Sequence, residues 1–323
     1  MATRDRVVIV VPGDDPPQIQ GSPHLDRLKP WGEVQLYTDR PKSVDEQLAR
    51  AKDAVCLVNT RGAVKWPADA LRALPKLRMA TVCGIGTDAF DLVVAQELGI
   101  VVCNIPGRTA PIVAEHAFGL MLAVAKRAYF QTASLKAGRW PRLDNVYLNG
   151  KTLGLVGTGN IGGVMARLAR AIGMDIVAWT FNPSAERAAA LNLRFLPLDE
   201  MLATADVVSV HVRLSPQSRG LIGARELGLM KRGSILINAS RGAMVDSAAL
   251  VDALNAGHLA GAGLDVFDQE PLPPDHPILR CEHVVLTPHN ADQTPEGMDI
   301  LNEGVVDNVI AFLKGRPQNV VTA

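Results

Sequence analysis

Three side chains that could perform acid, base and anion-binding chemistry follow three successive apolar runs late in the sequence. They are Arg241 after "SILINAS", Glu270 after "GAGLDVF" and His289 at the end of "HVVLTPH". A histidine can give a proton to a carbonyl oxygen near neutral pH, and a carboxylate beside it would fix which ring nitrogen carries that proton. A guanidinium suits a substrate carboxylate. Each residue alone also fits a surface or turn position, but together they predict a site that reduces a 2-oxo acid, given a hydride donor.

The hydride donor is indicated by the stretch "TLGLVGTGNIGGVMARLARAIGMDIVAWTFNPSAER", which begins at Thr152. Gly157, Gly159 and Gly162 form GxGxxG between an apolar strand and a helix with apolar residues at three-and-four spacing. The first glycine permits the tight turn, the second lets the backbone approach a pyrophosphate, and the third lets helix pack on strand. The phosphates would then meet the amides at the helix N-terminus. This pattern predicts a bound dinucleotide, NAD or NADP.

The residue that commonly separates NAD from NADP is missing. Dinucleotide folds usually carry an acid at the end of the second strand, where it binds the ribose hydroxyls of NAD and repels a 2′-phosphate. Thr180 stands at that place. Thr180 and Asn182 could hydrogen-bond a ribose, and Arg187 could approach a phosphate or be a solvated helix residue. The sequence leaves the choice between the two cofactors open.

Short β-branched runs that alternate with helical segments predict parallel strands joined by crossover helices. Five runs precede residue 106, namely "RVVIVV", "EVQLYT", "AVCLVN", "RMATVCG" and "VVCNI". Six follow Lys151, namely "TLGLVG", "DIVAWT", "DVVSVHV", "SILINAS", "GAGLDVF" and "HVVLTPH", which suffices for a dinucleotide domain. One long helix is expected from Thr109 to about Gln131. The predicted fold class is α/β, with two doubly wound parallel-sheet domains: a Rossmann cofactor domain and a flavodoxin-like substrate domain.

The last helical segment, residues 294–313, has no strand of its own to cover. It fits two places, since it could return to the first domain or dock on the second. We adopt the first as the expectation. The substrate domain is then discontinuous, residues 1–105 plus 294–323, and the dinucleotide-binding domain spans 106–293. A ligand site is expected between the two domains.

Composition narrows the class of partner. The 323 residues carry 33 basic and 33 acidic side chains without a run of like charge, which argues against nucleic acid or a membrane surface and favours a small solute. Four cysteines, Cys56, Cys83, Cys103 and Cys281, are scattered without a CxxC pair, which indicates reduced core residues and no metal. The start lacks a signal-peptide pattern, and no apolar stretch is long enough for a membrane span. We expect a cytoplasmic protein.

The sequence resembles the D-isomer-specific 2-hydroxyacid dehydrogenases, phosphoglycerate dehydrogenase-like members included. The resemblance covers nearly the whole chain through "VCGIGTDAFDL", "IPGRTAPIVAEHAFGLMLA", "LGLVGTGNIG", "HVRLSPQSRGLIG", "LINASRGAMVD", "GAGLDVFDQEPLP" and "LTPHNAD". It implies that Arg241 binds substrate, that Glu270 supports the histidine, and that His289 is the acid/base. It further implies a small 2-oxo or 2-hydroxy acid substrate, a homodimer formed through the cofactor domain, and no metal.

The resemblance also implies which residues bind the two ligands. Asp265 would lie near the nicotinamide carboxamide and Thr109 in the cofactor cleft. The candidate cofactor-binding residues are Thr109, Gly157, Gly159, Asn160, Ile161, Gly162, Thr180, Asn182, Arg213, Ala239 and Asp265. The candidate substrate-binding residues are Arg61 and the backbone of Cys83, Gly84, Ile85 and Gly86.

Departures from the family pattern leave two arginines open. Arg213 stands where the family often has proline, so it is either a cofactor contact or a surface charge. Arg61 is either a second carboxylate or phosphate grip or part of a structural salt bridge. The alternative function is a non-catalytic, dinucleotide-sensing protein like the transcriptional corepressors that resemble this family, because those also keep the Arg, Glu and His. Formate or phosphite oxidation is a closer alternative on the same architecture.

Overall fold

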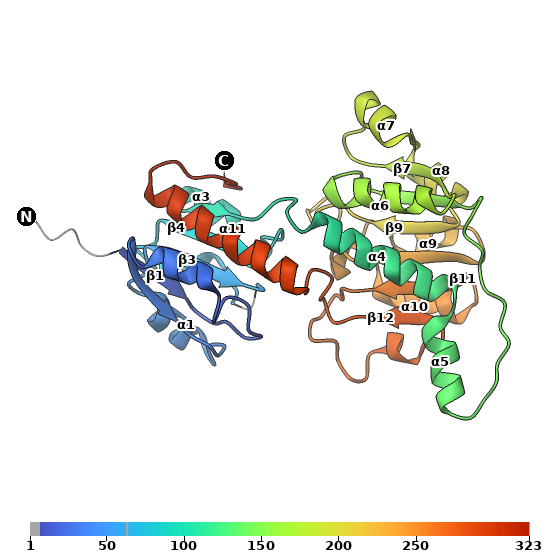
Figure 1. Ribbon diagram of the computed structural model, residues 1–323, viewed down its shortest axis with the longest axis horizontal. Coiled ribbons are helices and arrows are strands. Elements are labelled where there is room, and N and C mark those ends of the chain that lie inside the picture. Colours follow the sequence, from blue (N-terminus) through green and yellow to red (C-terminus); the bar gives the residue numbers. More distant parts are fainter. Residues whose placement is uncertain (1–6, 63, 323) are drawn as a thin grey trace, which may run out of the picture. The chain divides into compact units, whose positions relative to one another are not determined.

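The structure is a computed structural model that describes residues 7–62 and 64–322. Residues 1–6 and 323 of the expected substrate domain, including the first residue of "RVVIVV", lie outside the described residues. The chain divides into two compact units, each built on its own parallel sheet (Figure 1). The first contains the described residues up to Thr109 and those from Gln293 onward, and the second is Ala110–Asp292.

The first unit contains a five-stranded sheet with the order β2-β1-β3-β4-β5. All its pairings are parallel, and this is the strand order of flavodoxin-like folds. The strands are β1 (Val7–Val11), β2 (Gly32–Leu36), β3 (Cys56–Thr60), β4 (Met79–Cys83) and β5 (Val101–Cys103), and the helices between them are η1 (Pro23–Leu28), α1 (Val44–Ala51), α2 (Ala68–Arg72) and α3 (Leu92–Glu97). Every residue of β3 and β4 is buried. Burial on both faces of a parallel sheet explains why such strands appear in the sequence as largely apolar runs.

Helix α11 (Pro295–Leu313) belongs to the first unit, where it packs on β4 (Figure 1). Leu301, Val305 and Val309 are fully buried in a cluster with residues of β1, β3 and β4. Asn302 on the same helix joins Gln18, whose carbonyl oxygen accepts its side-chain N–H at 2.9 Å. Of the two places that the sequence left open, this last helix occupies the one on the first sheet.

The second unit contains a seven-stranded sheet with the order β12-β11-β10-β9-β6-β7-β8. Read from β6, this is the 3-2-1-4-5-6 order of the Rossmann fold with one strand added, so the predicted fold class is confirmed. The strands are β6 (Thr152–Val156), β7 (Asp175–Trp179), β8 (Arg194–Phe195), β9 (Val207–Val210), β10 (Ser234–Asn238), β11 (Leu259–Leu264) and β12 (Val284–Leu286). The six predicted strands are present. The sequence did not indicate β8, which is the third strand of the Rossmann order, and β12 is the strand added to that order.

Helices cover the second sheet. They are α4 (Ala110–Ala125), α5 (Ala128–Lys136), α6 (Asn160–Ala171), α7 (Ala185–Leu191), α8 (Leu198–Thr204), α9 (Ala224–Leu229), η2 (Gly242–Met244), α10 (Ser247–Asn255) and η3 (Pro277–Arg280). No helix within residues 7–62 and 64–322 is long and apolar enough to cross a membrane.

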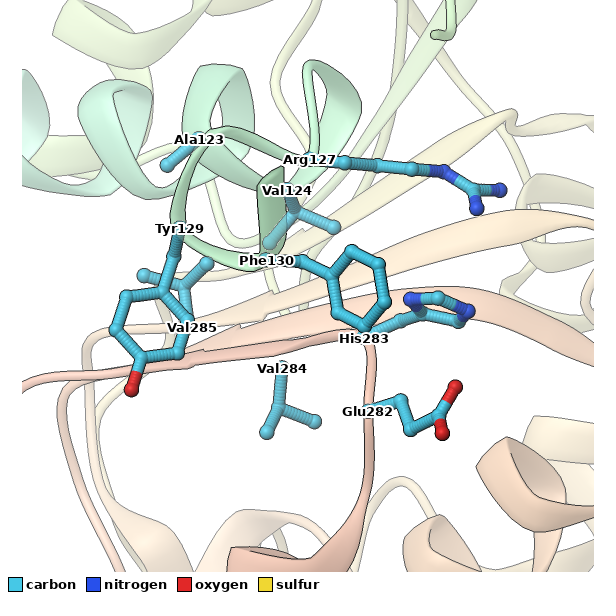
Figure 2. Close-up of a pocket in the computed structure, with 9 residues that line it drawn as sticks. All are labelled: Ala123, Val124, Arg127, Tyr129, Phe130, Glu282, His283, Val284 and Val285. Atoms are coloured by element: carbon cyan, nitrogen blue, oxygen red, sulfur yellow. The ribbon is translucent and has the colours of Figure 1, made fainter. Parts of the chain in front are cut away.

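The prediction of one long helix from Thr109 to Gln131 was wrong, because the helix is interrupted between α4, which ends at Ala125, and α5, which begins at Ala128. Arg127 adopts a left-handed backbone with φ of 49°. The side-chain amide of Gln131 donates to the carbonyl oxygen of Lys126 at 2.8 Å, which satisfies an acceptor that the break frees. Figure 2 shows the hollow at this break, where the ring of Phe130 lies edge-on to that of His283 with centroids 5.5 Å apart.

Helix α4 lies unusually close to β11 because two residues of that strand are glycines. A Cβ atom on Gly261 would overlap the carbonyl oxygen of His283 and lie 2.7 Å from Cγ1 of Val124, and one on Gly263 would lie 2.9 Å from Cβ of Leu120. Real Cβ atoms do not approach other atoms this closely, so the helix could not occupy its position over an alanine. The two glycines therefore fix how α4 sits on the strand that leads to Asp265.

Candidate active site

His289 and Glu270 form the central pair of the candidate site. Nδ1 of His289 lies 2.6 Å from Oε2 of Glu270, and Oε1 of the same carboxylate accepts the backbone N–H of Phe267 at 2.9 Å. Burial would raise the pKa of the Glu270 carboxyl, but hydrogen bonds from His289 and Phe267 and the charges of His289 and Arg241 outweigh it and lower that pKa. The carboxylate is therefore ionised at neutral pH and holds the proton on Nδ1, which leaves Nε2 for a substrate.

The backbone that carries His289 is held in an uncommon conformation. Its φ is 51°, in the left-handed region that non-glycine residues seldom adopt, although histidine does so more often than most. The residues on both sides are anchored: Thr287 donates its N–H to the carbonyl oxygen of Leu264 at 2.9 Å, and Asn290 and Ala291 donate theirs to the carboxylate of Asp265 at 3.0 Å each. The turn is therefore fixed by the end of β11.

Arg241 is brought to the same end of the sheet. It follows β10, and its Nη1 donates to the carbonyl oxygen of Ser240 at 2.7 Å. The next residue, Gly242, packs so tightly on Phe267 that a Cβ atom would overlap the carbonyl group of that residue. This contact joins the loop after β10 to the loop that carries Glu270, and the positive charge of Arg241 helps to lower the pKa of the Glu270 carboxyl. The structure thus brings the three predicted residues to neighbouring loops.

The glycine turn has the geometry that a pyrophosphate requires. Gly157 has φ of 102°, and a Cβ there would lie 2.9 Å from the backbone of His211. Gly159 caps α6 in an extended conformation, and no described atom lies within 4 Å of the place where its Cβ would be. A Cβ on Gly162 would overlap the carbonyl oxygen of Gly157. The tight turn, the open approach and the close packing are the three features expected of this motif.

An unsatisfied polar atom lies beside that open approach. Oγ1 of Thr158 is buried and finds no hydrogen-bond partner among the described residues. The turn is followed by Asn160 and Ile161 in the first turn of α6, whose N-terminal amides are available to an anion. These residues fit a dinucleotide: the backbone of residues 157–162 and the Thr158 hydroxyl would hold its phosphates.

The other cofactor candidates differ in accessibility. Thr180 follows β7 and is half-buried, whereas Asn182 and Arg187 are exposed, and Ser184 caps α7 by accepting the N–H of Arg187 at 3.3 Å. The aromatic ring of Phe181 packs edge-on to that of Trp179.

The remaining four cofactor candidates lie further along the chain or in the first unit. Ala239 is buried at the end of β10, and Asp265 is buried after β11. Arg213 is exposed, and its carbonyl oxygen accepts the hydroxyl of Ser218 at 2.7 Å. Thr109 is buried at the end of the first unit's opening segment, and its Oγ1 has no partner within the described part of the chain.

The substrate candidates lie in the first unit, at the carboxyl ends of β3 and β4. Cys83 ends β4, and the carbonyl oxygens of Gly84 and Ile85 accept hydrogen bonds from the N–H of Ile105 at 2.9 Å and the side chain of Asn104 at 2.7 Å. These bonds fix the loop that runs on to Gly86. Arg61 follows β3 in a left-handed conformation with φ of 50°.

Sequence reasoning missed two histidines of the second unit. His211 lies beside Gly157, and its Nε2 is 2.8 Å from Oγ of Ser209. Burial lowers the pKa of His211 to about 4, so it is neutral at physiological pH. His116 on α4 lies 2.9 Å, by its Nε2, from Oγ1 of Thr287. The sequence signal for both was weak, since each reads as a lone polar residue in or after an apolar run.

The Rossmann strand order, the glycine turn and the histidine–carboxylate pair together define a dinucleotide-dependent oxidoreductase. The family model described as "D-isomer specific 2-hydroxyacid dehydrogenase, NAD binding domain" matches residues 118–291. The chain belongs to this family, which confirms the resemblance seen in the sequence, and the family and its close relatives are NAD-dependent dehydrogenases of D-2-hydroxy acids.

Individual relatives support the same family membership. The chain is 38% identical over 307 residues to a glyoxylate reductase of Korarchaeum cryptofilum, with 92% of each chain covered. It is 37% identical over 298 residues to a D-3-phosphoglycerate dehydrogenase of Archaeoglobus fulgidus, covering 91% of this chain but only 56% of that protein. Among solved structures it is similar to D-lactate dehydrogenase from Aquifex aeolicus complexed with NAD and lactic acid, with a TM-score of 0.86, 28% identity and coverage of 98% and 99%.

Proposed function

We propose that the protein interconverts a small 2-oxo acid and the corresponding D-2-hydroxy acid, with His289 as acid/base, Glu270 as its support and Arg241 as the group that binds the substrate carboxylate. The observation that carries this proposal is the 2.6 Å contact between Nδ1 of His289 and the Glu270 carboxylate. It is the arrangement in which one ring nitrogen is held and the other is available for proton transfer.

In this mechanism the protein's own residues transfer the proton and neutralise the charge of the substrate carboxylate. A nicotinamide held by the glycine turn would supply or accept the hydride at the substrate C2. In reduction, Nε2 of His289 gives its proton to the carbonyl oxygen as that oxygen becomes an alkoxide, and the ionised Glu270 stabilises the protonated ring beforehand. In oxidation the neutral Nε2 takes the hydroxyl proton. Arg241 neutralises the substrate carboxylate in both directions.

Our choice of the first substrate to test is supported by how much of two relatives the chain covers. The glyoxylate reductase relative is matched over 92% of its length, whereas the phosphoglycerate dehydrogenase relative extends well beyond this chain. We therefore place glyoxylate first among the small 2-oxo acids to be tested. We also propose that the backbone from Cys83 to Gly86, with Arg61, binds the substrate carboxylate; within this run the N–H of Gly84 already donates to the carbonyl oxygen of Val82 at 3.0 Å.

A second copy of the chain is the proposed partner, bound through the second unit. Large apolar side chains are exposed on α5 and in the loop that follows: Tyr129, Leu135, Trp140 and Tyr147 are 66%, 49%, 81% and 73% exposed. Several large apolar side chains exposed in one segment support a protein interface there. We also propose a cytoplasmic location, which the four free and buried cysteines support.

The test compares single-residue variants in a nicotinamide absorbance assay with glyoxylate and hydroxypyruvate. His289→Ala should lower kcat about a hundredfold or more, and Glu270→Gln should also lower it, while NADH still binds. His24→Ala is the control and should leave kcat unchanged, because the His24 ring contacts Asp299 on α11 and both residues lie in the first unit, whereas His289 lies in the second.

Normal turnover by His289→Ala would contradict the acid/base role. The wild-type protein could instead bind NADH and turn over no substrate in a panel of 2-oxo acids, formate and phosphite. That result would favour the alternative of a non-catalytic, corepressor-like protein.

A further inference from the structure

A network of hydrogen bonds lies behind the turn that carries His289. The carboxylate of Asp265, whose side chain is 1% exposed, accepts the hydroxyl of Thr287 at 2.6 Å and the backbone N–H groups of Asn290 and Ala291 at 3.0 Å each. Nε2 of His116 lies 2.9 Å from the Thr287 oxygen and 3.5 Å from Oδ1 of Asp265. The network therefore connects helix α4 to the residues on both sides of His289.

The direction of these hydrogen bonds follows from the number of protons available. Thr287 has one hydroxyl proton, and the ionised carboxylate of Asp265 at 2.6 Å takes it, because a carboxylate only accepts. Nε2 of His116 must then be the donor to the Thr287 oxygen. Burial would raise the pKa of Asp265, but hydrogen bonds from His116, Thr287 and the Asn290 backbone lower it. His116 thus helps to keep a buried carboxylate charged.

The position of His116 over Asp265 follows from the sequence of β11. Gly261 and Gly263 lie in β11 and Asp265 directly follows it; the three are two residues apart, about 6.6 Å per step in an extended chain. Val124, Leu120 and His116 are four residues apart along the helix, about 6.0 Å per step. Val124 packs on Gly261 and Leu120 packs on Gly263, because neither glycine has a Cβ atom. The next pair in the same register is His116 and Asp265.

We propose that His116 is a positioning residue for the acid/base: by donating to Thr287 and facing Asp265, it holds the left-handed turn that presents His289. The inference rests on the proposed role of His289. The turn needs such support because φ of 51° is unfavourable for a residue other than glycine. If the carboxylate or its partners shift, the N–H groups of Asn290 and Ala291 are released, and the His289 ring moves away from its productive position.

The experiment measures kcat, KM for glyoxylate, the Kd of NADH and the thermal midpoint for matched variants of the full chain. His116→Leu removes the donor and should lower kcat about tenfold or more, since small misplacements of a catalytic group are costly, while the Kd of NADH stays close to that of the wild type. His116→Gln places an amide N–H where Nε2–H lies and should restore most of the lost kcat. Val124→Ala is the control: it removes a contact of the same helix about two turns from His116, while the contact of Leu120 with Gly263 next to the network remains, so it should lower stability but not kcat.

Two outcomes would overturn the proposal. One is wild-type kcat in His116→Leu, and the other is equal loss in the Leu and Gln variants, which would indicate a merely structural side chain. Thr287→Val, which keeps the shape and removes the hydroxyl, gives the same test if His116→Leu does not fold: unchanged kcat would again refute the proposal. If the proposed function is wrong, the His289→Ala variant will have normal kcat. If His289→Ala is inactive while His116→Leu is fully active, only the positioning role of His116 is refuted.

Discussion

An alanine at position 159 should weaken cofactor binding while leaving the fold intact. Gly159 has φ of −70° and ψ of −160°, a conformation that alanine adopts without strain. No described atom lies within 4 Å of the new Cβ, so the methyl group meets open space in the protein alone. Its cost to the helix cap is below about 1 kcal/mol. The open space is the route by which a pyrophosphate would approach the amides of α6.

The magnitude follows from the bonds that the methyl group displaces. Losing one charge-assisted hydrogen bond between the phosphates and the amides costs about 1.5–3 kcal/mol. Because about 1.4 kcal/mol corresponds to a factor of ten, the Kd of NADH should rise about 10- to 100-fold. Gly162→Ala differs, since its Cβ would overlap the carbonyl oxygen of Gly157, and it should lose stability as well as affinity.

The assay combines calorimetric titration with NADH and thermal unfolding of the same samples. The matched control is Gly228→Ala, which makes the same chemical change at an exposed helix glycine with no described atom within 4 Å. It should bind NADH as the wild type does and lose no stability, because alanine is the better helix former. Unchanged affinity in Gly159→Ala would refute the reasoning, since the pyrophosphate would then not pass the second glycine.

Two further predictions concern charge. Thr180→Asp restores an acid at the end of β7 and should raise the Kd of NADPH relative to that of NADH by about tenfold through repulsion of the 2′-phosphate; equal changes in both Kd values, measured by fluorescence titration, would show that the ribose lies elsewhere. The lowered pKa of Asp265 means that its ionised form stabilises the fold above an unfolded-state pKa of about 3.9 and that this stability is lost as pH falls through the folded-state pKa. Urea unfolding of Asp265→Asn across the acid range should therefore show a flatter dependence on pH than the wild type, and parallel curves would contradict the assignment.

The main strands could be predicted from the sequence because parallel strands buried on both faces appear as apolar runs. Strand β8 could not, since Arg194–Phe195 is two residues long and has no such run. The break at Arg127 was missed because neither Lys126 nor Arg127 is a helix breaker. That break depends on a side chain four residues later, Gln131, which satisfies the Lys126 carbonyl.

The candidate site could be predicted for those residues whose positions are set by the strand order alone. Arg241, Glu270 and His289 follow three strands of one parallel sheet, whose carboxyl ends lie at the same edge, and the pairing of His289 with Glu270 was expected on that basis. His116 was not predictable in the same way. Its partner Thr287 is 171 positions away, and only the packing of α4 on two glycines of β11 brings the two together.

The matching of steps between α4 and β11 restricts the kinds of change that this part of the chain can accept over time. Substitutions along either element alter single contacts. An insertion or deletion of one residue between His116 and Leu120 would rotate the histidine by about 100° around the helix, and one between Gly263 and Asp265 would turn the carboxylate to the opposite face of the sheet. Both elements should therefore keep a constant length between these residues in descendants that retain the site, whereas the loops at their ends are free to grow or shorten.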